Sequence, residues 1–288
     1  MKNETNTYKW LLLLAMLLWG GGWTALKILT NEQTIEVIIF WRFFLMSLSF
    51  IPILYFFKKP IQLNKNALTY IASSSVLNIL FMVFSFIGVH AGLAGSGSVI
   101  ITTFSPILTF ILFALLYRKH LTVLQYFSLF LGLLGGFILL QLNDISLFLQ
   151  SSNIYFLLCA LVWAGVTLLS QHSAEHIHPI HYSFFISLVA TIAAFTYAFD
   201  SNLLVVFDEG LEFWIALIYL AVLGQTVATT IFFTASSKLG SQTTSSFMFL
   251  VPIFALLSAW FVLDEPIELH IIVGGFISMF AVYYLNKK

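Results

Sequence analysis

The sequence predicts an all-α integral membrane protein with ten transmembrane helices in two inverted five-helix repeats around a central cavity. The first observation is composition, because 60% of the 288 residues are hydrophobic and only 8% are charged. A soluble domain is nearer half apolar and a quarter charged, so lipid must solvate this chain. The second is length, since a span of about 20 residues with its loop takes roughly 28 residues, which gives about ten spans. The third is similarity between the two halves of the chain.

The first repeat, residues 1–147, holds five of the predicted spans. Its first apolar run follows two lysines, as in a signal peptide, but it continues through Trp19 to Ala25 without a small-residue cleavage site. A membrane helix is therefore favoured. The short segment Arg118–Thr122 separates the fourth span from the fifth. The five spans are at 10–29, 35–57, 67–89, 94–117 and 122–142.

The second repeat, residues 148–288, holds the other five spans. The single cysteine, Cys159, lies within the first of them and excludes an intramolecular disulfide framework. These spans are at 153–171, 181–199, 212–235, 241–263 and 268–285.

Loop charges predict the orientation, because only Lys and Arg in short loops determine which side faces the cytoplasm. Ten of the twelve basic residues fall on one side of the predicted spans, the others being Lys27 and Arg42. Both termini are therefore expected to be cytoplasmic, in a multi-pass protein of the cell (inner) membrane. The ten are Lys2, Lys9, Lys58, Lys59, Lys65, Arg118, Lys119, Lys238, Lys287 and Lys288. The acids of the opposite side are Glu32, Glu36, Asp144, Asp200, Asp208, Glu209, Glu212, Asp264, Glu265 and Glu268.

The two halves share short sequence matches at a nearly constant offset. Leu17–Gly20 in the first span matches Leu161–Ala164 in the sixth, with Trp19 and Trp163 separated by 144 positions (163 − 19). Three further matches have an offset of 146: Phe86 with Phe232, Leu93 with Leu239, and Pro106 with Pro252. The chain is therefore expected to consist of two structural repeats.

An odd number of spans in each repeat makes the second repeat enter the membrane inverted. The turn charges agree, because Arg118–Lys119 after the fourth span is basic, whereas Asp264–Glu265 after the ninth is acidic. Inverted repeats are characteristic of secondary transporters, which place the substrate site near the bilayer midplane between the repeats.

These motifs together resemble the EamA-type family of the drug/metabolite transporter superfamily. The matching segments are Leu18–Trp23 with Lys27, Trp41–Phe44, Ala94–Ser98 before Pro106, Gly240–Ser246 before Pro252, and Asp264–Pro266. The resemblance implies two inverted five-helix halves and a cavity open alternately to each side, for substrates that range from amino acids to drugs. The chain departs from the family at the basic turn Arg118–His120, and no Glu or Asp lies inside a span away from its ends.

Four residues at mid-depth are the main candidates for substrate binding. Trp19 and Trp163 are central in the first and sixth spans, and Asn78 and Gln225 are central in the third and eighth. Tryptophan is usually found at the membrane interface, and an amide in hydrocarbon needs a partner. A shared cavity explains all four. The alternative is that the tryptophans pack between helices and the amides bond to neighbouring backbone.

The fourth and ninth spans begin with small and hydroxyl residues. Thr102 and Thr244 are added to the predicted binding site, and Pro106 and Pro252 are predicted helix breaks whose freed carbonyls face the cavity. Helix packing alone is the alternative. Packing faces, or a contact in a homodimer, are also expected from Gly132, Gly135, Gly136, Gly274 and Gly275.

Arg42 is predicted to be a gating or structural charge. It lies about seven residues inside the second span, roughly 10 Å below its end at 1.5 Å per residue. A guanidinium at that depth needs a partner or water. Alternatively, Arg42 reaches the outer surface or pairs with Glu36.

No cofactor, metal or catalytic residue is expected. His172, His176, His178 and His181 share one loop but lack the cysteine or closely set carboxylates that a tetrahedral site needs. The formal charge is zero without a basic tail, which argues against nucleic acid as a partner. The expected partners are membrane lipid and a small-molecule substrate, with the chain as a monomer or a weak homodimer.

The predicted function is secondary transport, as an exporter or exchanger, of a small organic metabolite that is neutral, zwitterionic or aromatic. Tryptophans, amides and hydroxyls without an acid suit such a compound better than a polycation. Two alternatives remain: an integral membrane enzyme acting on lipids, which needs a His/Asp/Glu constellation, and a non-transporting membrane scaffold, which needs only an apolar interior.

Overall fold

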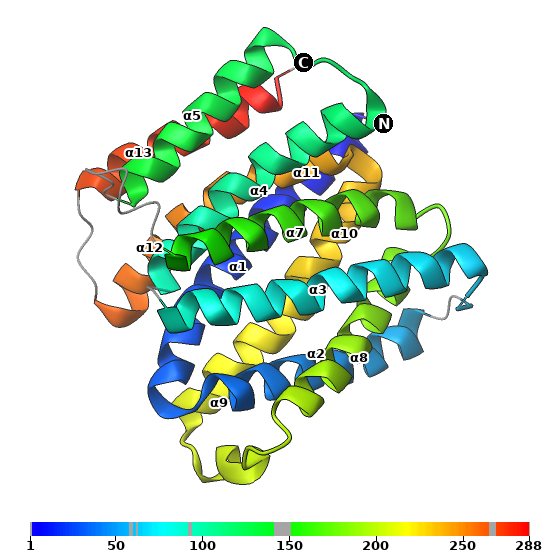
Figure 1. Ribbon diagram of the computed structural model, residues 1–288, viewed down its shortest axis with the longest axis vertical. Helices are drawn as coiled ribbons and strands as arrows, with labels where there is room; N and C mark the ends of the chain where they lie inside the picture. The colour runs from blue at the N-terminus through cyan, green and yellow to red at the C-terminus, as the bar shows by residue number, and fades with distance from the viewer. Residues whose placement is uncertain are drawn as a thin grey trace.

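The computed structural model describes residues 2–57, 60–61, 63–91, 94–140, 151–264 and 269–287, and every regular element in these ranges is a helix (Figure 1). The first half contains α1 (Lys2–Glu32), α2 (Ile35–Phe57), α3 (Lys65–Ala91), α4 (Ala94–Tyr117) and α5 (Val123–Leu139). The second half contains α7 (Ser151–Ser173), α8 (Pro179–Tyr197), η1 (Leu203–Asp208), α9 (Leu211–Ile218), η2 (Tyr219–Val227), α10 (Ala228–Leu239), α11 (Ser241–Ser246), η3 (Phe247–Leu250), α12 (Val251–Leu263) and α13 (Leu269–Leu285).

Several of these helices are long and apolar enough to cross a membrane, so the chain is a multi-pass membrane protein. Eight such stretches occur in the described residues: Glu4–Glu32, Ile35–Phe57, Lys65–Gly88, Gly97–Tyr117, Asn153–Ser173, Pro179–Tyr197, Leu211–Leu239 and Ser241–Leu263. The fifth and tenth predicted spans correspond to the shorter apolar helices Val123–Leu139 and Ile272–Leu285. The all-helical membrane class is thus confirmed, and the count of ten spans stays a prediction.

Helix ends agree closely with the predicted spans, with one large difference. The second and fourth spans have the observed bounds of α2 and α4, but α1 begins eight residues before its predicted start at position 10. Its 31 residues are about 46 Å long, more than the roughly 30 Å of hydrocarbon. The polar first turns therefore continue the helix beyond the lipid core. The repeat boundary at 147/148, the end of the fifth span at 141–142, and the charges Lys58, Lys59, Asp144, Glu265, Glu268 and Lys288 lie outside the described residues.

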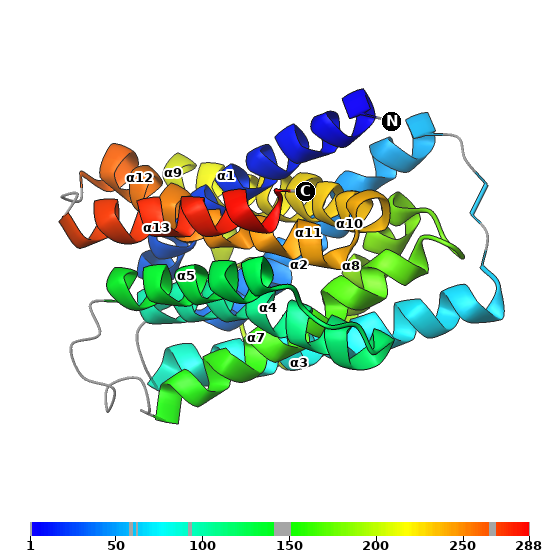
Figure 2. The same ribbon diagram turned by 90° about the horizontal axis from the view of Figure 1, so that it is seen from above.

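Helix packing has an approximate two-fold pattern. The helix α7 packs on α3 and α4, and α1 packs on α10, η2 and α12, while α2 pairs with α8 and α5 with α13 (Figure 1, Figure 2). In chain order, α1 and α2 correspond to α7 and α8, α3 to α9–η2–α10, α4 to α11–η3–α12, and α5 to α13. Exchanging each helix with its counterpart reproduces the same set of pairs. This pattern supports two structural repeats.

Glycines allow the closest of these approaches. A Cβ at Gly20 of α1 would lie 2.5 Å from the Cβ of Phe254 and 2.7 Å from the backbone nitrogen of Ala255 in α12. A Cβ at Gly135 would lie 2.9 Å from the carbonyl oxygen of Gly274, where α5 meets α13. These two glycines serve packing within one chain.

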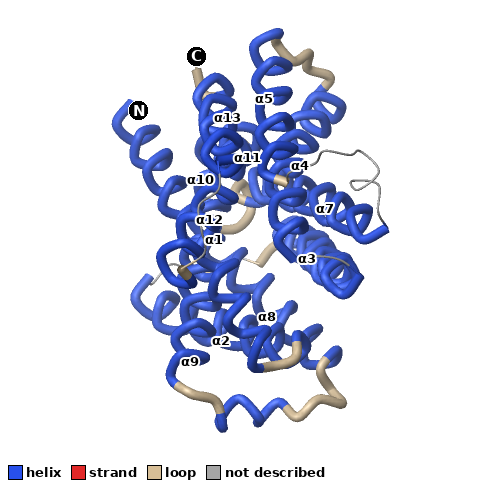
Figure 3. The backbone as a smooth tube through the Cα atoms, turned by 90° about the vertical axis from the view of Figure 1, so that its left-hand side faces the viewer, coloured by secondary structure: helices blue, strands red, loops and turns tan. Residues whose placement is uncertain are grey.

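The two ends of the bundle are built differently. Both termini lie near each other in all three views, and Figure 1 and Figure 2 place them at one end of the bundle (Figure 1, Figure 2, Figure 3). At the other end, η1 packs against the end of α1 and the start of α2, in a core cluster that includes Leu29, Ile38 and Val206. The Trp41 indole N–H donates to the Leu203 carbonyl at 2.7 Å, which holds η1 in place.

Candidate functional site

The two predicted tryptophans meet inside the bundle, where both pack against its main core cluster. Trp19 of α1 and Trp163 of α7 contact edge to face, with ring centroids 5.6 Å apart. Phe232 of α10 lies 4.9 Å from Trp19, and Phe81 of α3 lies 5.4 Å from Trp163. We call these four residues the aromatic cluster. It joins two helices of the first half to two of the second.

Sequence reasoning did not assign Phe81 or Phe232 to the site. The chain contains 31 phenylalanines, so a single Phe at mid-depth carries almost no information. Phe232 was noted only as a repeat match. The signal that could have found both residues is their place on the third and eighth spans, near Asn78 and Gln225.

The two indole N–H groups have different surroundings. Trp19 donates to the Gly224 carbonyl at 2.8 Å, across the two halves. Gly224 lies in η2, a π-helical segment, where the shift to i→i+5 bonding alters the register of main-chain hydrogen bonds. In the described structure the Trp163 Nε1 is buried and has no hydrogen-bond partner. A buried N–H normally has one, so Trp163 holds an unused donor beside the aromatic cluster.

Arg42 of α2 is bound by Gln225 of η2. With the amide of Gln225 oriented so that its oxygen faces the guanidinium, that oxygen accepts from the Arg42 Nε at 3.0 Å and also from Nη2. The guanidinium also lies over the Phe43 ring, 5.5 Å from its centroid. Glu36, the partner considered from the sequence, instead accepts from the Tyr197 hydroxyl at 3.4 Å. The structure therefore pairs the partly buried cation with a neutral amide.

Asn78 and Thr102 bond within their own helices. The Asn78 Nδ2 donates to the Ser74 carbonyl at 2.9 Å, and the Thr102 hydroxyl donates to the Ser98 carbonyl at 2.7 Å. Thr244 is fully buried, and its hydroxyl has no partner among the described residues. Among the described residues, no hydrogen bond joins these three side chains to the aromatic cluster. The structure thus brings together Trp19 and Trp163, links Gln225 through η2, and shows no hydrogen bond from the other three described side chains to the aromatic cluster.

The two predicted helix breaks differ. Pro252 lies in the first turn of α12, directly after the 3₁₀ segment η3, so the helix does change there. Pro106 lies inside α4, which continues from Ala94 to Tyr117 without interruption. The prediction of a break at Pro106 is corrected, because neighbouring hydroxyls and helices let a membrane helix tolerate proline.

The histidine loop makes local contacts. His172 bonds the Tyr117 hydroxyl, His176 stacks on Tyr70 with centroids 5.5 Å apart, and the His178 side chain caps α8. Within the described ranges, no three His, Cys, Asp or Glu side chains gather closely enough to hold a metal ion. These histidines act in joining α7 to α8 and in packing that turn.

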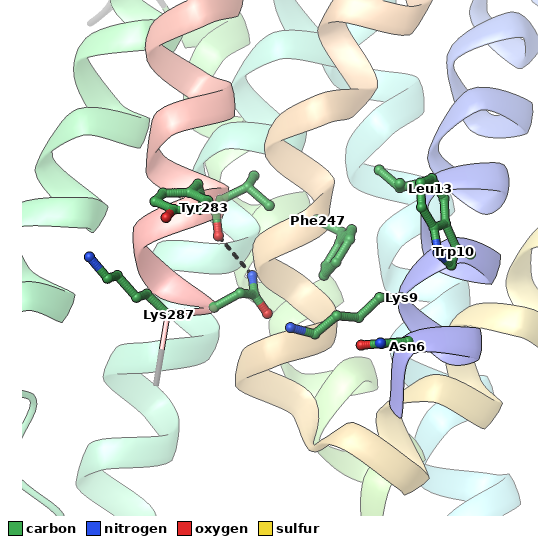
Figure 4. Close-up of a pocket in the computed structure, with 9 residues that line it drawn as sticks. Asn6, Lys9, Trp10, Leu13, Phe247, Tyr283 and Lys287 are labelled. Atoms are coloured by element: carbon green, nitrogen blue, oxygen red, sulfur yellow. Dashed lines mark hydrogen bonds between the residues drawn. The ribbon is translucent and has the colours of Figure 1, made fainter. Parts of the chain in front are cut away.

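A groove opens at the end that carries both termini. It has a volume of about 460 Å³ and lies between α1, η3 and α13 (Figure 4). It is separate from the aromatic cluster, because none of the four cluster residues lines it.

The arrangement provides groups that can bind a small molecule. The aromatic cluster provides apolar ring faces and one unused N–H donor, and the Arg42–Gln225 pair provides a cation held by an amide that another acceptor could replace. These groups lie where the two halves contact each other. A molecule bound there would touch both halves, so a movement of one half against the other would change its contacts.

Comparisons with known proteins give a consistent result. A model of the EamA-like transporter family matches the chain twice, over residues 7–141 and 150–287. An uncharacterized transporter of Archaeoglobus fulgidus is 24% identical over 299 residues, covering 100% of this chain and 99% of that protein. Uncharacterized transporter YoaV of Bacillus subtilis is 21% identical, covering 93% and 92%.

Two further likenesses extend over the full chain. Uncharacterized transporter sll0355 of Synechocystis sp. is 26% identical, covering 100% of this chain and 92% of that protein. One crystal structure aligns with a TM-score of 0.77 at 13% identity, over 98% of this chain and 96% of the other. At that identity the structural likeness shows the fold alone.

Proposed function

This chain belongs to the EamA-like transporter family and is a membrane transporter, and we propose that it moves a small organic metabolite across the cell membrane by alternating access. Transport would be secondary, as an exporter or exchanger. The observation that carries this proposal is the contact between Trp19 and Trp163, which places aromatic side chains of equivalent helices together between the two halves.

We also propose the topology predicted from the sequence: ten spans, with residues 1–147 forming one repeat and 148–288 its inverted copy. Two observations support it. The helix pairs are related by an approximate two-fold exchange, and both termini lie at one end of the bundle (Figure 1). The positive charges near that end favour a cytoplasmic position for it.

The proposed substrate is neutral, zwitterionic or aromatic. The aromatic cluster offers ring faces for an apolar body, and the Trp163 N–H can donate to a carbonyl or carboxylate oxygen. Asn78, Thr102 and Thr244 also belong to the proposed substrate site, with their contacts to substrate made in the alternative conformation of the transport cycle.

Arg42 and Gln225 act as a gate in this proposal. Their hydrogen bonds connect α2 of the first half to η2 of the second. A rocking motion of the halves must exchange these bonds for others, or a substrate oxygen must replace the amide. Gln225 therefore holds the arginine first and contacts substrate only when it is released.

The test of binding is a thermal-shift screen of the purified protein against metabolites, because a ligand that binds only the folded state raises the melting temperature. The ligand found is then titrated against Trp163→Phe. We expect about a fivefold loss of affinity, the value of one neutral hydrogen bond. The matched control is Trp260→Phe, on α12 and 50% exposed. Equal affinities for both variants would place the binding site elsewhere.

The test of topology is labelling with an impermeant thiol reagent in intact cells. Cys159 is buried, so it leaves a low background. A cysteine placed at Ser201, between α8 and η1, should react from outside, and one at Asn64, before α3, should not. The reverse pattern would reject the proposed orientation without affecting the binding test.

A further inference from the structure

The groove between α1, η3 and α13 has an amphipathic lining. Asn6, Lys9, Trp10 and Leu13 line it from one face of α1, at the i, i+3, i+4 and i+7 spacing of a helix. Figure 4 shows them facing Tyr283 and Lys287 of the C-terminal segment across Phe247. Two side chains are cationic, and the nine lining residues include no acid.

The groove lies at the depth of lipid headgroups. The helix α1 is about 16 Å longer than a roughly 30 Å hydrocarbon core, and the part that lines the groove is its start. Trp10 is 72% exposed and Tyr283 is 60% exposed on the outer surface of the bundle. Exposed Trp and Tyr side chains of membrane proteins are concentrated at the interface.

The remaining lining distinguishes a lipid from a free anion. Leu13, Phe247 and Val282 form an apolar wall on the side of the groove toward the bundle. Asn286 is held there by its own bonds, since its Nδ2 donates to the Ser246 hydroxyl at 2.9 Å and to the Val282 carbonyl at 2.8 Å. The Lys287 ammonium lies over the Tyr284 ring, 6.0 Å from its centroid, so the Lys287 side chain must turn toward Lys9 for both ammonium groups to bind one phosphate. The attached glycerol and acyl chains would then lie against this apolar wall.

We propose that this groove binds one anionic phospholipid by its headgroup, in the leaflet that faces both termini. The two lysines bind the phosphate, and the apolar wall receives the first carbons of the acyl chains. Basic pockets between helices on the cytoplasmic side are known to bind such headgroups. Because α1 belongs to the first half and η3 and α13 to the second, the bound lipid contacts both halves.

The experiment measures lipid retained by the purified full-length protein in native mass spectrometry. The probes are dioleoyl phosphatidylglycerol and dioleoyl phosphatidylcholine, which differ only in headgroup. We expect the wild-type chain to retain one phosphatidylglycerol in preference to phosphatidylcholine. Each lysine should contribute about fivefold, so Lys9→Gln/Lys287→Gln should weaken retention by about 25-fold. Lys287→Gln alone should weaken it about fivefold, which serves if the double variant is not recovered.

Two controls distinguish lipid binding in the groove from nonspecific attraction of anionic lipid to surface lysines. Lys119→Gln/Lys238→Gln removes the same charge from exposed positions outside the groove and should leave retention unchanged. Asn6→Trp keeps both lysines but fills the groove mouth, and should reduce retention. The proposal is overturned if both lysine pairs lose lipid equally, if Asn6→Trp retains it fully, or if inorganic phosphate displaces the lipid from the wild-type protein.

Discussion

The helix α3 of the first half runs as one α-helix from Lys65 to Ala91, whereas its counterpart passes from α9 through the π-helical η2 into α10. Each carries an amide at its middle. The Asn78 amide donates to the Ser74 carbonyl of its own helix, while the Gln225 amide binds the guanidinium of Arg42. An amide near the middle of the span thus serves local bonding in one half and contact between the halves in the other.

This difference shows where a repeat can acquire function. A regular α-helix uses its carbonyls in its own ladder, so α3 has little polar backbone to offer its neighbours. The irregular η2 instead places Gly224 to accept from Trp19 and Gln225 to bind Arg42. Segments of π-helix are frequent at functional sites. The second half therefore provides the polar partners, and the first half provides the side chains that reach them.

The largest effect on transport is expected from replacing Arg42, the cation that Gln225 binds. Arg42→Leu should lower transport at least tenfold, because the amide of Gln225 then has no charged donor and the contact between halves is lost. Transport of the identified ligand into proteoliposomes measures it, with gel filtration to confirm folding. Lys27→Gln, nearer the end of α1, is the control and should have a mild effect. Equal transport by both variants would remove Arg42 from the gate.

The next effect compares the two amides directly. Gln225→Leu leaves the guanidinium without its acceptor and should reduce the stability by about 1.5–3 kcal/mol, as for hydrogen bonds to charged groups. Asn78→Leu removes a neutral bond to a carbonyl of the same helix and should reduce it by roughly 0.5 kcal/mol. Thermal melting in one detergent ranks the variants. A larger loss for Asn78→Leu would reverse the assignment of roles to the two helices.

Substitution of the two tryptophans should affect protein stability and ligand affinity in opposite orders. Trp19→Phe breaks the bond to Gly224 and should reduce stability by about 1 kcal/mol, whereas Trp163→Phe breaks none and should be near neutral. For ligand affinity we expect the opposite order, with the larger loss at Trp163. Melting curves with and without ligand give both quantities. The idea fails if Trp163→Phe lowers the melting temperature and leaves affinity intact.

The smallest effect concerns the hydroxyls. Thr244→Val removes a buried hydroxyl without a partner and should be neutral or slightly stabilising. Thr102→Val removes a bond to Ser98 and should reduce stability by about 0.5 kcal/mol. Both replacements conserve shape, so the difference between their melting temperatures isolates the bond. A marked destabilisation by Thr244→Val would reveal a partner for that hydroxyl in the other conformation.

Composition and periodicity were sufficient to predict the membrane class and most helix bounds, because lipid requires long apolar runs whose ends are marked by charge and proline. Trp19 and Trp163 were predicted to line a shared cavity at mid-depth. The structure shows their rings in contact, and the shared cavity stays a prediction. The sequence did not predict that Gln225 binds Arg42. Glu36 is nearer in sequence, but contact with Gln225 depends on how α2 packs on η2.

The irregularity of η2 had a signal in the sequence. The offset between the halves rises from 144 at Trp163 to 146 at Phe232, so the second half holds two additional residues between these positions. The π-helical bonding of η2 takes up more residues per turn than an α-helix. Offset alone cannot locate the addition, because the loops between the seventh and eighth spans could equally absorb it.

The segment η2 also sets the angular register of everything that follows it. Each residue of an α-helix turns the chain by about 100° and advances it by about 1.5 Å. A deletion inside Tyr219–Val227 that restored α-helical bonding would therefore rotate α10 as a unit. Phe232 would turn away from Trp19, and Lys238 at the far end would turn with it. The π-helical bonding of η2 thus sets the rotation of α10, and with it the directions of both Phe232 in the aromatic cluster and Lys238 near the membrane surface.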